Sequence, residues 1–279
     1  MRISELKKGE HITDFEVIKK LQLNILKEFD EFCTKHNLKY CITAGTLLGA
    51  VRHGGYIPWD DDIDVGMFRP DYEKLISLYD EMPDSCKIFS REINPNHSRL
   101  YGKICNTDYI SVDSFYDEKS SGYLGIDVFP LEAVPENRKE FLKLAKKTKV
   151  IRQLFIFANS ALFKGNSFLK AYIIKPIPII ICKIIGADKL YKLFKKVATS
   201  RNYDDSKAIA LLTGLYTENE SFPKERYYDL IRLDFEGLKL PAVKDYDSYL
   251  SQIYGDYMKL PPVDKRQPHH SFSVYKLMK

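Results

Sequence analysis

The sequence of 279 residues predicts an α+β protein, in which helices flank a mixed β-sheet core and a lysine-rich helical segment lies in the middle of the chain. Three observations predict this class. Over the first 135 residues, amphipathic helical patterns alternate with short apolar runs of strand length. The segment 136–210 is lysine-rich and mostly helical in pattern. A strand pair and an aromatic helix then follow, so residues 211–279 are expected to complete the first part.

The clearest helix is expected over residues 13–36, where apolar residues recur at helical spacing on one face. Its first residues, TDFE, form a capping box in which Thr13 is the N-cap and Glu16 follows three residues later. Residues 38–44 are expected to form a buried strand. A short helix over 46–53 then follows this strand.

The next elements continue the alternation. Residues 63–68 predict a second strand, and residues 69–82 predict a helix with Pro70 in its first turn. A strand pair is expected over 233–243, followed by a helix from Asp245 to about Met258. Further short strands are expected at 86–90, 99–105 and 123–129.

Composition restricts the class of protein. Hydrophobic residues make up 44% and charged residues 29% of the chain, which is ordinary for a globular protein. The five cysteines are scattered without a CxxC pair, which favours a reducing compartment over a disulfide framework or a zinc site. The N-terminus has no apolar secretion signal and no run is long enough to span a bilayer, so we expect a cytoplasmic protein. A net charge of +5 permits contact with phosphates or an anionic membrane, and we expect no nucleic-acid partner.

The segment PWDDDIDV, residues 58–65, crowds four aspartates between apolar residues. Alternate side chains of a strand share a face, so Asp62 and Asp64 are expected to point the same way, with Asp60 as a possible third, while Asp61 points elsewhere. Carboxylates on one face repel each other unless a cation or raised pKa values relieve them. Such oxygen ligands suit Mg²⁺ or Mn²⁺. A solvated acidic turn is the alternative, whereas a calcium loop is excluded because Val65 occupies its glycine position.

A turn at Gly45 and Thr46 precedes the aspartates by about 16 residues. A strand that runs into a glycine and then a helix presents free backbone N–H groups, which is a place to hold a phosphate. A glycine-plus-hydroxyl turn, then two aspartates on a strand, then a third carboxylate on a later strand resembles the nucleotidyltransferase superfamily. The third carboxylate is Asp127 in YLGIDVFPL, unless it only caps a strand end.

The resemblance narrows to one family. TAGTLLGAVRHGGYIPWDDDIDVGM, together with GIDVFPL and the late YLSQIYGDYMKLPP, resembles the LicD family of phosphocholine transferases, whose relatives include the fukutin group. The likeness extends from the first helix to near residue 270 and is weakest between 140 and 210. It implies a catalytic core over 1–135, a helical insertion over 136–210 that is a candidate for a membrane-facing element, and a C-terminal part over 211–279 that completes the catalytic domain.

The resemblance implies a metal-dependent transfer of phosphocholine from CDP-choline to a sugar hydroxyl of a cell-surface, teichoic-acid-type glycan precursor, with release of CMP. We assign Asp62, Asp64 and Asp127 to catalysis and, with Asp60, to the metal, Mg²⁺ or Mn²⁺. Asp127 is either a ligand or the base for the attacking hydroxyl. Residues expected to bind substrate are Gly45, Thr46, Arg52, His53, Trp59, Lys103, Lys265, Arg266, His269 and His270.

Each of these substrate residues has a plainer alternative. Arg52 and His53 could be surface caps, Lys103 a solvated side chain and the tail KRQPHH a disordered end. Trp59 is the best-placed aromatic residue for a choline headgroup. Other donors remain open, namely CDP-ribitol or CDP-glycerol. A protein of another class, which binds a nucleotide or a membrane without catalysis, is also open.

The segment 168–196 is apolar but interrupted by Lys175, Pro176, Pro178 and Lys183. These interruptions argue against a bilayer span, and the basic flanks favour an element that lies on an anionic membrane. Buried helices are the alternative. With a lipid-linked acceptor, we expect a peripheral protein at the inner face of the cell membrane.

Overall fold

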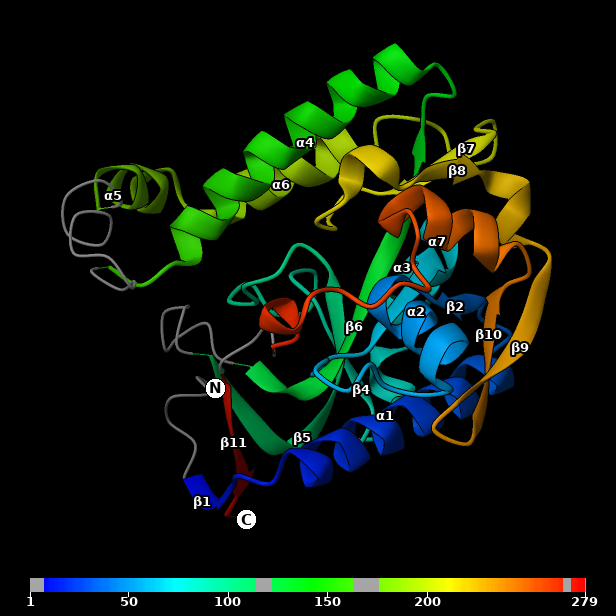
Figure 1. Ribbon diagram of the computed structural model, residues 1–279. Helices are drawn as coiled ribbons and strands as arrows, with labels where there is room; N and C mark the ends of the chain where they lie inside the picture. The colour runs from blue at the N-terminus through cyan, green and yellow to red at the C-terminus, as the bar shows by residue number, and fades with distance from the viewer. Residues whose placement is uncertain (1–7, 114–121, 163–175, 268–271, 279) are drawn as a thin grey trace.

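The computed structural model describes residues 8–113, 122–162, 176–267 and 272–278. A mixed sheet forms its centre, in the order β1-β11-β5-β6-β3-β2, with β4 paired to β5, β7 paired to β6, and β8 paired to β7. Helix α1 runs along one side of this sheet, and α4–α6 form a separate helical layer at the end of β6 (Figure 1). The expected mixed sheet with flanking helices is therefore confirmed.

The helices of the described ranges are α1 (Phe15–Lys35), α2 (Ala44–His53), α3 (Arg69–Ser77), α4 (Arg138–Asn159), α5 (Pro176–Ile185), α6 (Ala187–Ala198) and α7 (Tyr246–Tyr254). The strands are β1 (Lys8–Ile12), β2 (Tyr40–Ile42), β3 (Asp64–Phe68), β4 (Lys87–Phe89), β5 (Gly102–Asp113), β6 (Gly122–Val134), β7 (Ala208–Leu211), β8 (Ser221–Pro223), β9 (Leu230–Phe235), β10 (Leu238–Val243) and β11 (Phe272–Leu277).

The start of α1 corrects one expectation. The N-cap is Asp14, whose side chain accepts a hydrogen bond from the backbone N–H of Glu16, and Thr13 lies one residue outside the helix. Both residue types cap helices well, so TDFE contains two possible N-cap residues, and the helix uses Asp14.

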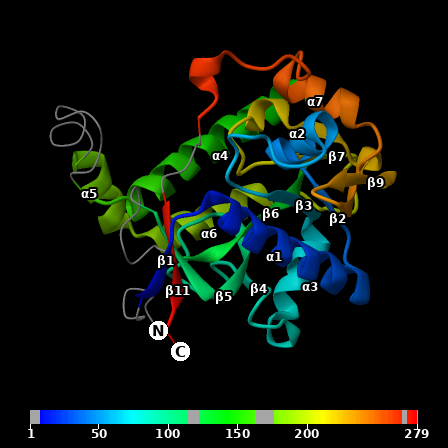
Figure 2. The same cartoon turned by 60° about the horizontal axis from the view of Figure 1, so that its bottom comes forward.

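Several strands differ from the sequence pattern. Residues 208–211, expected to be largely helical, form β7, and β5 and β6 extend well beyond the short runs that predicted them. Helix α7 ends at Tyr254, because Gly255 at its C-cap has a positive φ of 69°. Strands β1 and β11 pair with each other and bring the two ends of the described chain together at one edge of the sheet (Figure 2).

Two main hydrophobic clusters stabilise the fold. The larger one combines α1, α2, β2, β3 and β6 with the late β9, β10 and α7, so residues far apart in sequence share one core. The smaller one joins α4, α5 and α6 to β7 and to Val134 at the end of β6. Within the described chain, no helix has both the length and the apolar character needed to cross a bilayer.

Candidate active site

Two parallel strands bring two aspartates together. Asp64 begins β3, and it is the direct Cα partner of Asp127 in the neighbouring β6. Their apolar neighbours Ile63, Val65 and Val128 are fully buried. Side chains opposite each other on adjacent strands share a face, so both carboxylates leave the sheet on the same side. Both line a cleft of about 1410 Å³.

Asp60 and Asp62 line the same cleft. The expectation that Asp62 lies in the strand is wrong, since β3 begins two residues later at Asp64. Pairing with β6 nevertheless starts earlier, because the Asp127 N–H donates to the Ile63 carbonyl oxygen at 2.8 Å. Buried Ile63 therefore separates two half-buried aspartates, as the alternation predicted.

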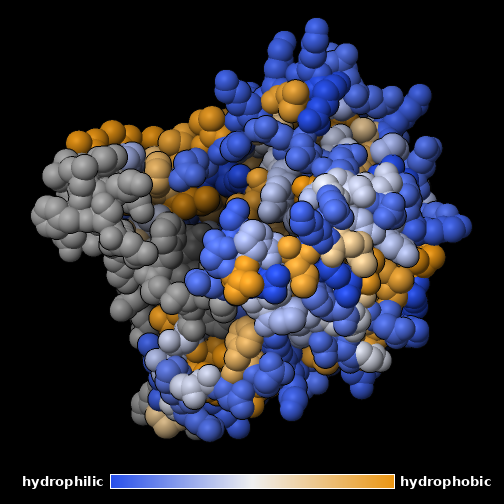
Figure 3. Space-filling view, in the orientation of Figure 1, coloured by the Kyte–Doolittle hydropathy of each residue, from blue (hydrophilic) through white to orange (hydrophobic). Residues whose placement is uncertain are grey.

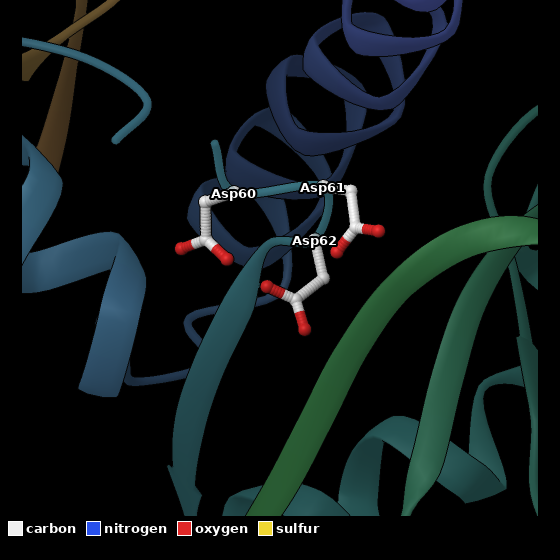
Figure 4. Close-up of side chains that lie close together, drawn as sticks. All are labelled: Asp60, Asp61 and Asp62. Carbon is white, nitrogen blue, oxygen red and sulfur yellow. The ribbon is translucent and has the colours of Figure 1, made fainter. Parts of the chain in front are cut away.

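Asp61 does not point away from the cluster. It is 2% exposed, and carboxylate oxygens of Asp60, Asp61 and Asp62 lie within 4.8 Å of one another (Figure 4). Its backbone carbonyl accepts a hydrogen bond from Gln22 Nε2 of α1 at 3.2 Å. The sequence could not indicate this placement, because β3 begins only at Asp64 and strand alternation does not extend back to residues 60 and 61.

The N-terminus of α2 lies against the aspartates. Gly45 and Thr46 are in the first turn of this helix, which begins at Ala44, so no separate turn precedes it. A Cβ on Gly45 would lie 2.8 Å from Asp60 Oδ2, so only glycine allows this close approach. Thr46 is buried, and its Oγ1 accepts a hydrogen bond from the Asp64 N–H at 2.8 Å. Thr46 thus holds the start of β3, and the Asp60 carboxylate occupies the space beside the helix N-terminus.

The carboxylates of the site differ in their protonation. Burial, together with the charges of Asp62 and Asp127, raises the pKa of Asp64 well above its usual range. Burial acts to raise the pKa of Asp127, but Lys103 together with Arg99 and Tyr101 outweighs it, and the net pKa is lowered. Lys103 Nζ lies 2.9 Å from Asp127 Oδ1 and is its direct Cα partner across β5 and β6.

This donor set fits a hard divalent cation. Asp60, Asp62, Asp64 and Asp127 offer only carboxylate oxygens along one cleft wall, and their mutual repulsion is what raises the pKa of Asp64 beyond the effect of burial. A cation such as Mg²⁺ or Mn²⁺ would relieve this repulsion. Asp60, Asp62, Asp64 and Asp127 remain the expected ligands, whereas the carboxylate oxygens that lie within 4.8 Å of one another are those of Asp60, Asp61 and Asp62.

Several predicted substrate residues surround the aspartates. Arg52, Trp59 and Lys265 line the cleft with Gly45. Arg52 donates from Nη1 to the Tyr257 carbonyl oxygen at 2.7 Å, and its Nε contacts exposed His53 at 3.0 Å.

Arg266 stacks over Trp59, with 5.6 Å from its guanidinium carbon to the ring centroid. His53 and Arg266, like Thr46 and Lys103, do not line the cleft themselves. His269 and His270 lie outside the described residues.

The cleft has further polar residues that sequence patterns did not single out. Arg99 and Tyr101 lie before and at the start of β5, and Tyr254 ends α7. Glu220 and Arg152 line the wall nearest β7 and α4. An isolated glutamate in TENESF has no motif around it, so only the tertiary structure shows that Glu220 is buried in the cleft.

Comparison with known proteins finds one matching family profile and several relatives of this chain. A family profile described as "LicD/FKTN/FKRP, nucleotidyltransferase domain" matches residues 37–168. The lipopolysaccharide cholinephosphotransferase LicD of Haemophilus influenzae is 30% identical over 261 residues, which cover 91% of this chain and 94% of that protein. An uncharacterized protein of Rickettsia prowazekii is 45% identical over 111 residues, or 34% of this chain and 42% of that one. The human ribitol 5-phosphate transferase FKRP is 50% identical over 34 residues, which is 12% of this chain and 7% of that protein.

Proposed function

The chain belongs to the LicD family, and from this premise we propose that it transfers a phosphoalkyl group, phosphocholine in the first place, from a CDP-linked donor to a sugar hydroxyl. The acceptor oxygen forms a bond to the phosphorus that carries choline. The bond between this phosphorus and the oxygen bridging the two phosphates breaks, and CMP leaves with that oxygen. The acceptor hydroxyl proton is lost to a base or to solvent.

The observation that carries this proposal is the pairing of Asp64 with Asp127 in one cleft wall, next to Asp60 and Asp62. Crowded carboxylates repel each other unless a cation or a raised pKa relieves the repulsion, and a cation in such a cleft can also bind a phosphate. The relative from Haemophilus influenzae, which aligns with 91% of this chain, is a lipopolysaccharide cholinephosphotransferase. Together they support phosphoryl chemistry at these four aspartates.

In our proposal Asp60, Asp62 and Asp64 hold Mg²⁺ or Mn²⁺. Such an ion, when bound, supplies charge neutralisation on the diphosphate and lowers the pKa of a bound hydroxyl. Asp127 has a lowered pKa beside Lys103, which makes it a weak base. We therefore favour Asp127 as a cation ligand over Asp127 as the base for the acceptor hydroxyl.

Basic and aromatic residues at the cleft mouth would orient the donor. Arg52 and Lys265 line the cleft within reach of a diphosphate, and Arg266 lies over Trp59. An arginine stacked on an indole competes for the face that would bind a choline ammonium. In our proposal Arg266 therefore moves to a phosphate when the donor binds, which frees Trp59.

CMP release from CDP-choline tests the proposal. We expect release with Mg²⁺, loss of release with EDTA, and recovery when Mg²⁺ is added in excess. The substitution Asp64→Asn should abolish release, while Glu218→Gln, an exposed change outside the cleft, should leave it unchanged. No CMP release by the unsubstituted chain, even with a purified teichoic-acid-type precursor present, would refute the enzymatic function.

A CDP-polyol is the second donor to test. The ribitol 5-phosphate transferase relative matches 34 residues at 50% identity, which supports ribitol phosphate as an alternative group. Turnover of CDP-ribitol or CDP-glycerol without turnover of CDP-choline would establish this alternative. A chain that binds these nucleotides tightly but releases no CMP would instead be a binding protein.

We also propose that α5 contacts an anionic membrane, which would bring the cleft near a lipid-linked acceptor at the inner face of the cell membrane. Apolar side chains gather at the upper left of the surface, where α5 lies (Figure 3). Five isoleucines of this helix are between 38% and 79% exposed, and four of them repeat at helical spacing on one face. Exposed lysines follow on α6. The isoleucines are Ile177, Ile180, Ile181, Ile184 and Ile185, and the lysines are Lys189, Lys192 and Lys196.

Sedimentation with vesicles tests this contact. We expect the chain to sediment with phosphatidylglycerol vesicles more than with phosphatidylcholine vesicles, because lysines attract anionic lipids. The double substitution Ile180→Glu and Ile184→Glu should abolish sedimentation. Val150→Glu, at an exposed apolar residue of α4, is the matched control. Equal binding by the α5 variant and the control would refute the contact.

A further inference from the structure

One part of the cleft wall has a different character from the aspartate cluster. It consists of Thr213 and Glu220, on either side of a short 3-10 helix between β7 and β8, with Tyr216 from the same loop and Tyr254 from α7. Figure 1 shows β7 and β8 beside α7, with α4 above them. Neither the proposed cation site nor the proposed diphosphate contacts use these residues.

Two buried polar atoms in this wall lack a hydrogen-bond partner. Glu220 is 2% exposed and Thr213 is 8% exposed, and both line the cleft. Within the described chain, Glu220 Oε2 and Thr213 Oγ1 have no hydrogen-bond partner. A buried polar atom without a partner costs about 1–3 kcal/mol, so a ligand that hydrogen-bonds to both groups would recover part of this cost.

The surrounding residues hold the two groups in place without satisfying them. Arg152 of α4 donates from Nη1 to the carbonyl oxygens of Thr213 and Gly214, with 2.8 Å to the first. Arg152 therefore fixes the loop backbone. Gly214 leaves room for the carboxyl, since a Cβ there would lie 2.5 Å from Glu220 Oε2. Glu220 Oε2 is thus packed against Gly214 in the cleft wall, in a loop whose backbone Arg152 holds.

Glu220 has the chemistry of a hydroxyl-binding group. Burial raises its pKa to about 8, against a lowering effect of Arg152, so the carboxyl is mostly protonated near pH 7. A neutral carboxyl both donates and accepts a hydrogen bond, as does the Thr213 hydroxyl. A sugar hydroxyl matches both. A choline ammonium has no N–H to donate and would gain little from a neutral group, and nearby Arg152 would repel it.

We propose that Thr213 and Glu220 bind hydroxyls of the acceptor sugar, with the ring resting on the aromatic faces of Tyr216 and Tyr254. This inference rests on the proposed transfer reaction and adds the position of its acceptor. The two tyrosine rings lie edge to face with centroids 5.3 Å apart and an interplanar angle of 74°, so they present two aromatic surfaces at a steep angle to each other. The sugar then lies in the cleft that also contains Asp64 and Asp127.

Binding of simple glycosides to the full chain tests the proposal without requiring turnover. The probes are the methyl β-glycosides of glucose, galactose and N-acetylgalactosamine, measured by saturation-transfer NMR with CDP and Mg²⁺ present. We expect at least one glycoside to bind the unsubstituted chain. Glu220→Met should weaken its binding about tenfold or more, and Thr213→Val should weaken it in the same way, because each removes a hydrogen bond to a hydroxyl.

Two comparisons separate a binding role from a structural one. Glu220→Gln keeps a group that donates and accepts, so it should retain most of the glycoside affinity that Glu220→Met loses. Glu218→Met, an exposed glutamate on the same loop, is the matched control and should bind as the unsubstituted chain does. The thermal unfolding temperature of Glu220→Met should not be lower than that of the unsubstituted chain, because an apolar side chain replaces an unpaired polar group.

Three results would overturn the proposal. One is the absence of binding by all three glycosides to the unsubstituted chain. Another is unchanged glycoside affinity in Glu220→Met. The third is a loss of affinity for CDP-choline but not for CDP in Glu220→Met, which would make the wall a headgroup site. Failure of CMP release would refute the proposed reaction, and it is measured separately from these affinities.

Discussion

A buried ion pair holds together the two strands that present Asp64 and Asp127. Arg69 follows β3 directly, and its guanidinium makes two hydrogen bonds to the carboxylate of Glu132 near the end of β6, one of them from Nε at 3.0 Å. The side chains are 13% and 3% exposed. Although burial alone would lower it, the pKa of Arg69 is raised by the adjacent Glu132 carboxylate. Arg69 therefore keeps its positive charge beside this carboxylate.

We predict that Glu132→Gln destabilises the protein by about 3–5 kcal/mol, because it leaves the Arg69 charge buried without a counter-charge. This is a large part of the roughly 5–15 kcal/mol that stabilises a typical domain. With a urea dependence of about 3 kcal/mol per M, the unfolding midpoint falls by about 1 M or more. Urea unfolding followed by circular dichroism measures this shift.

The double substitution Arg69→Met and Glu132→Leu is the control for the same prediction. It removes both charges together and fills their volume with apolar groups, so it should cost much less than Glu132→Gln alone. A loss below about 1 kcal/mol in the single variant would refute the reasoning, because the pair would then be screened by water. Equal losses in the single and the double variant would show that packing, and not charge, stabilises this junction.

Three further predictions concern the cleft. Asp64→Asn should lower CMP release by more than about a hundredfold, and Asp61→Asn should lower it less, because Asp64 lines the cleft and Asp61 does not; equal losses would contradict this order. Gly45→Ala should displace the Asp60 carboxylate and raise the Mg²⁺ concentration needed for half-maximal activity, whereas an unchanged requirement would remove Asp60 from the cation site. Burial raises the pKa of Glu220 from its usual value of 4.5 to about 8 in the folded protein. Between pH 4.5 and 8, folding therefore takes up a proton at this carboxyl. The free energy of unfolding then falls as the pH rises, by up to about 1.4 kcal/mol per pH unit. Glu220→Gln should remove that slope from urea unfolding measured between pH 5 and 8, and an unchanged slope would assign it to other groups.

The aspartate segment shows how far sequence reasoning extends. Alternation around buried Ile63 correctly placed Asp62 and Asp64 in one cleft, since a period of two is a property of the local backbone. The same reasoning gave the wrong position for Asp61, because the strand begins only at Asp64. The loop before it is held by a hydrogen bond from Gln22 of α1 to the Asp61 carbonyl oxygen. The pairing of Lys103 with Asp127 was not foreseen, since it depends on the register between β5 and β6.

Strands at the sheet edges were also not predicted from the sequence. Strands β1 and β11 are short segments near the two ends of the chain; they pair with each other, and β11 also pairs with β5. Strand β7 follows the helical segment α4–α6, and it becomes a strand because the end of β6 offers backbone groups for pairing. Local propensity is a weak guide where a partner strand decides the conformation.

The sequence by itself determined the class of fold, the main helix, the carboxylates of the proposed cation site and, through a long motif, the family. These are local properties, fixed by periodicity, capping residues and the spacing of charged groups along one segment. Only the tertiary structure decided which side chains share the cleft, that Lys103 lowers the pKa of Asp127, and that Glu220 is buried there without a partner. Burial and pairing depend on residues that are far apart in the sequence, and the free energy of a charge in a protein is set by those neighbours.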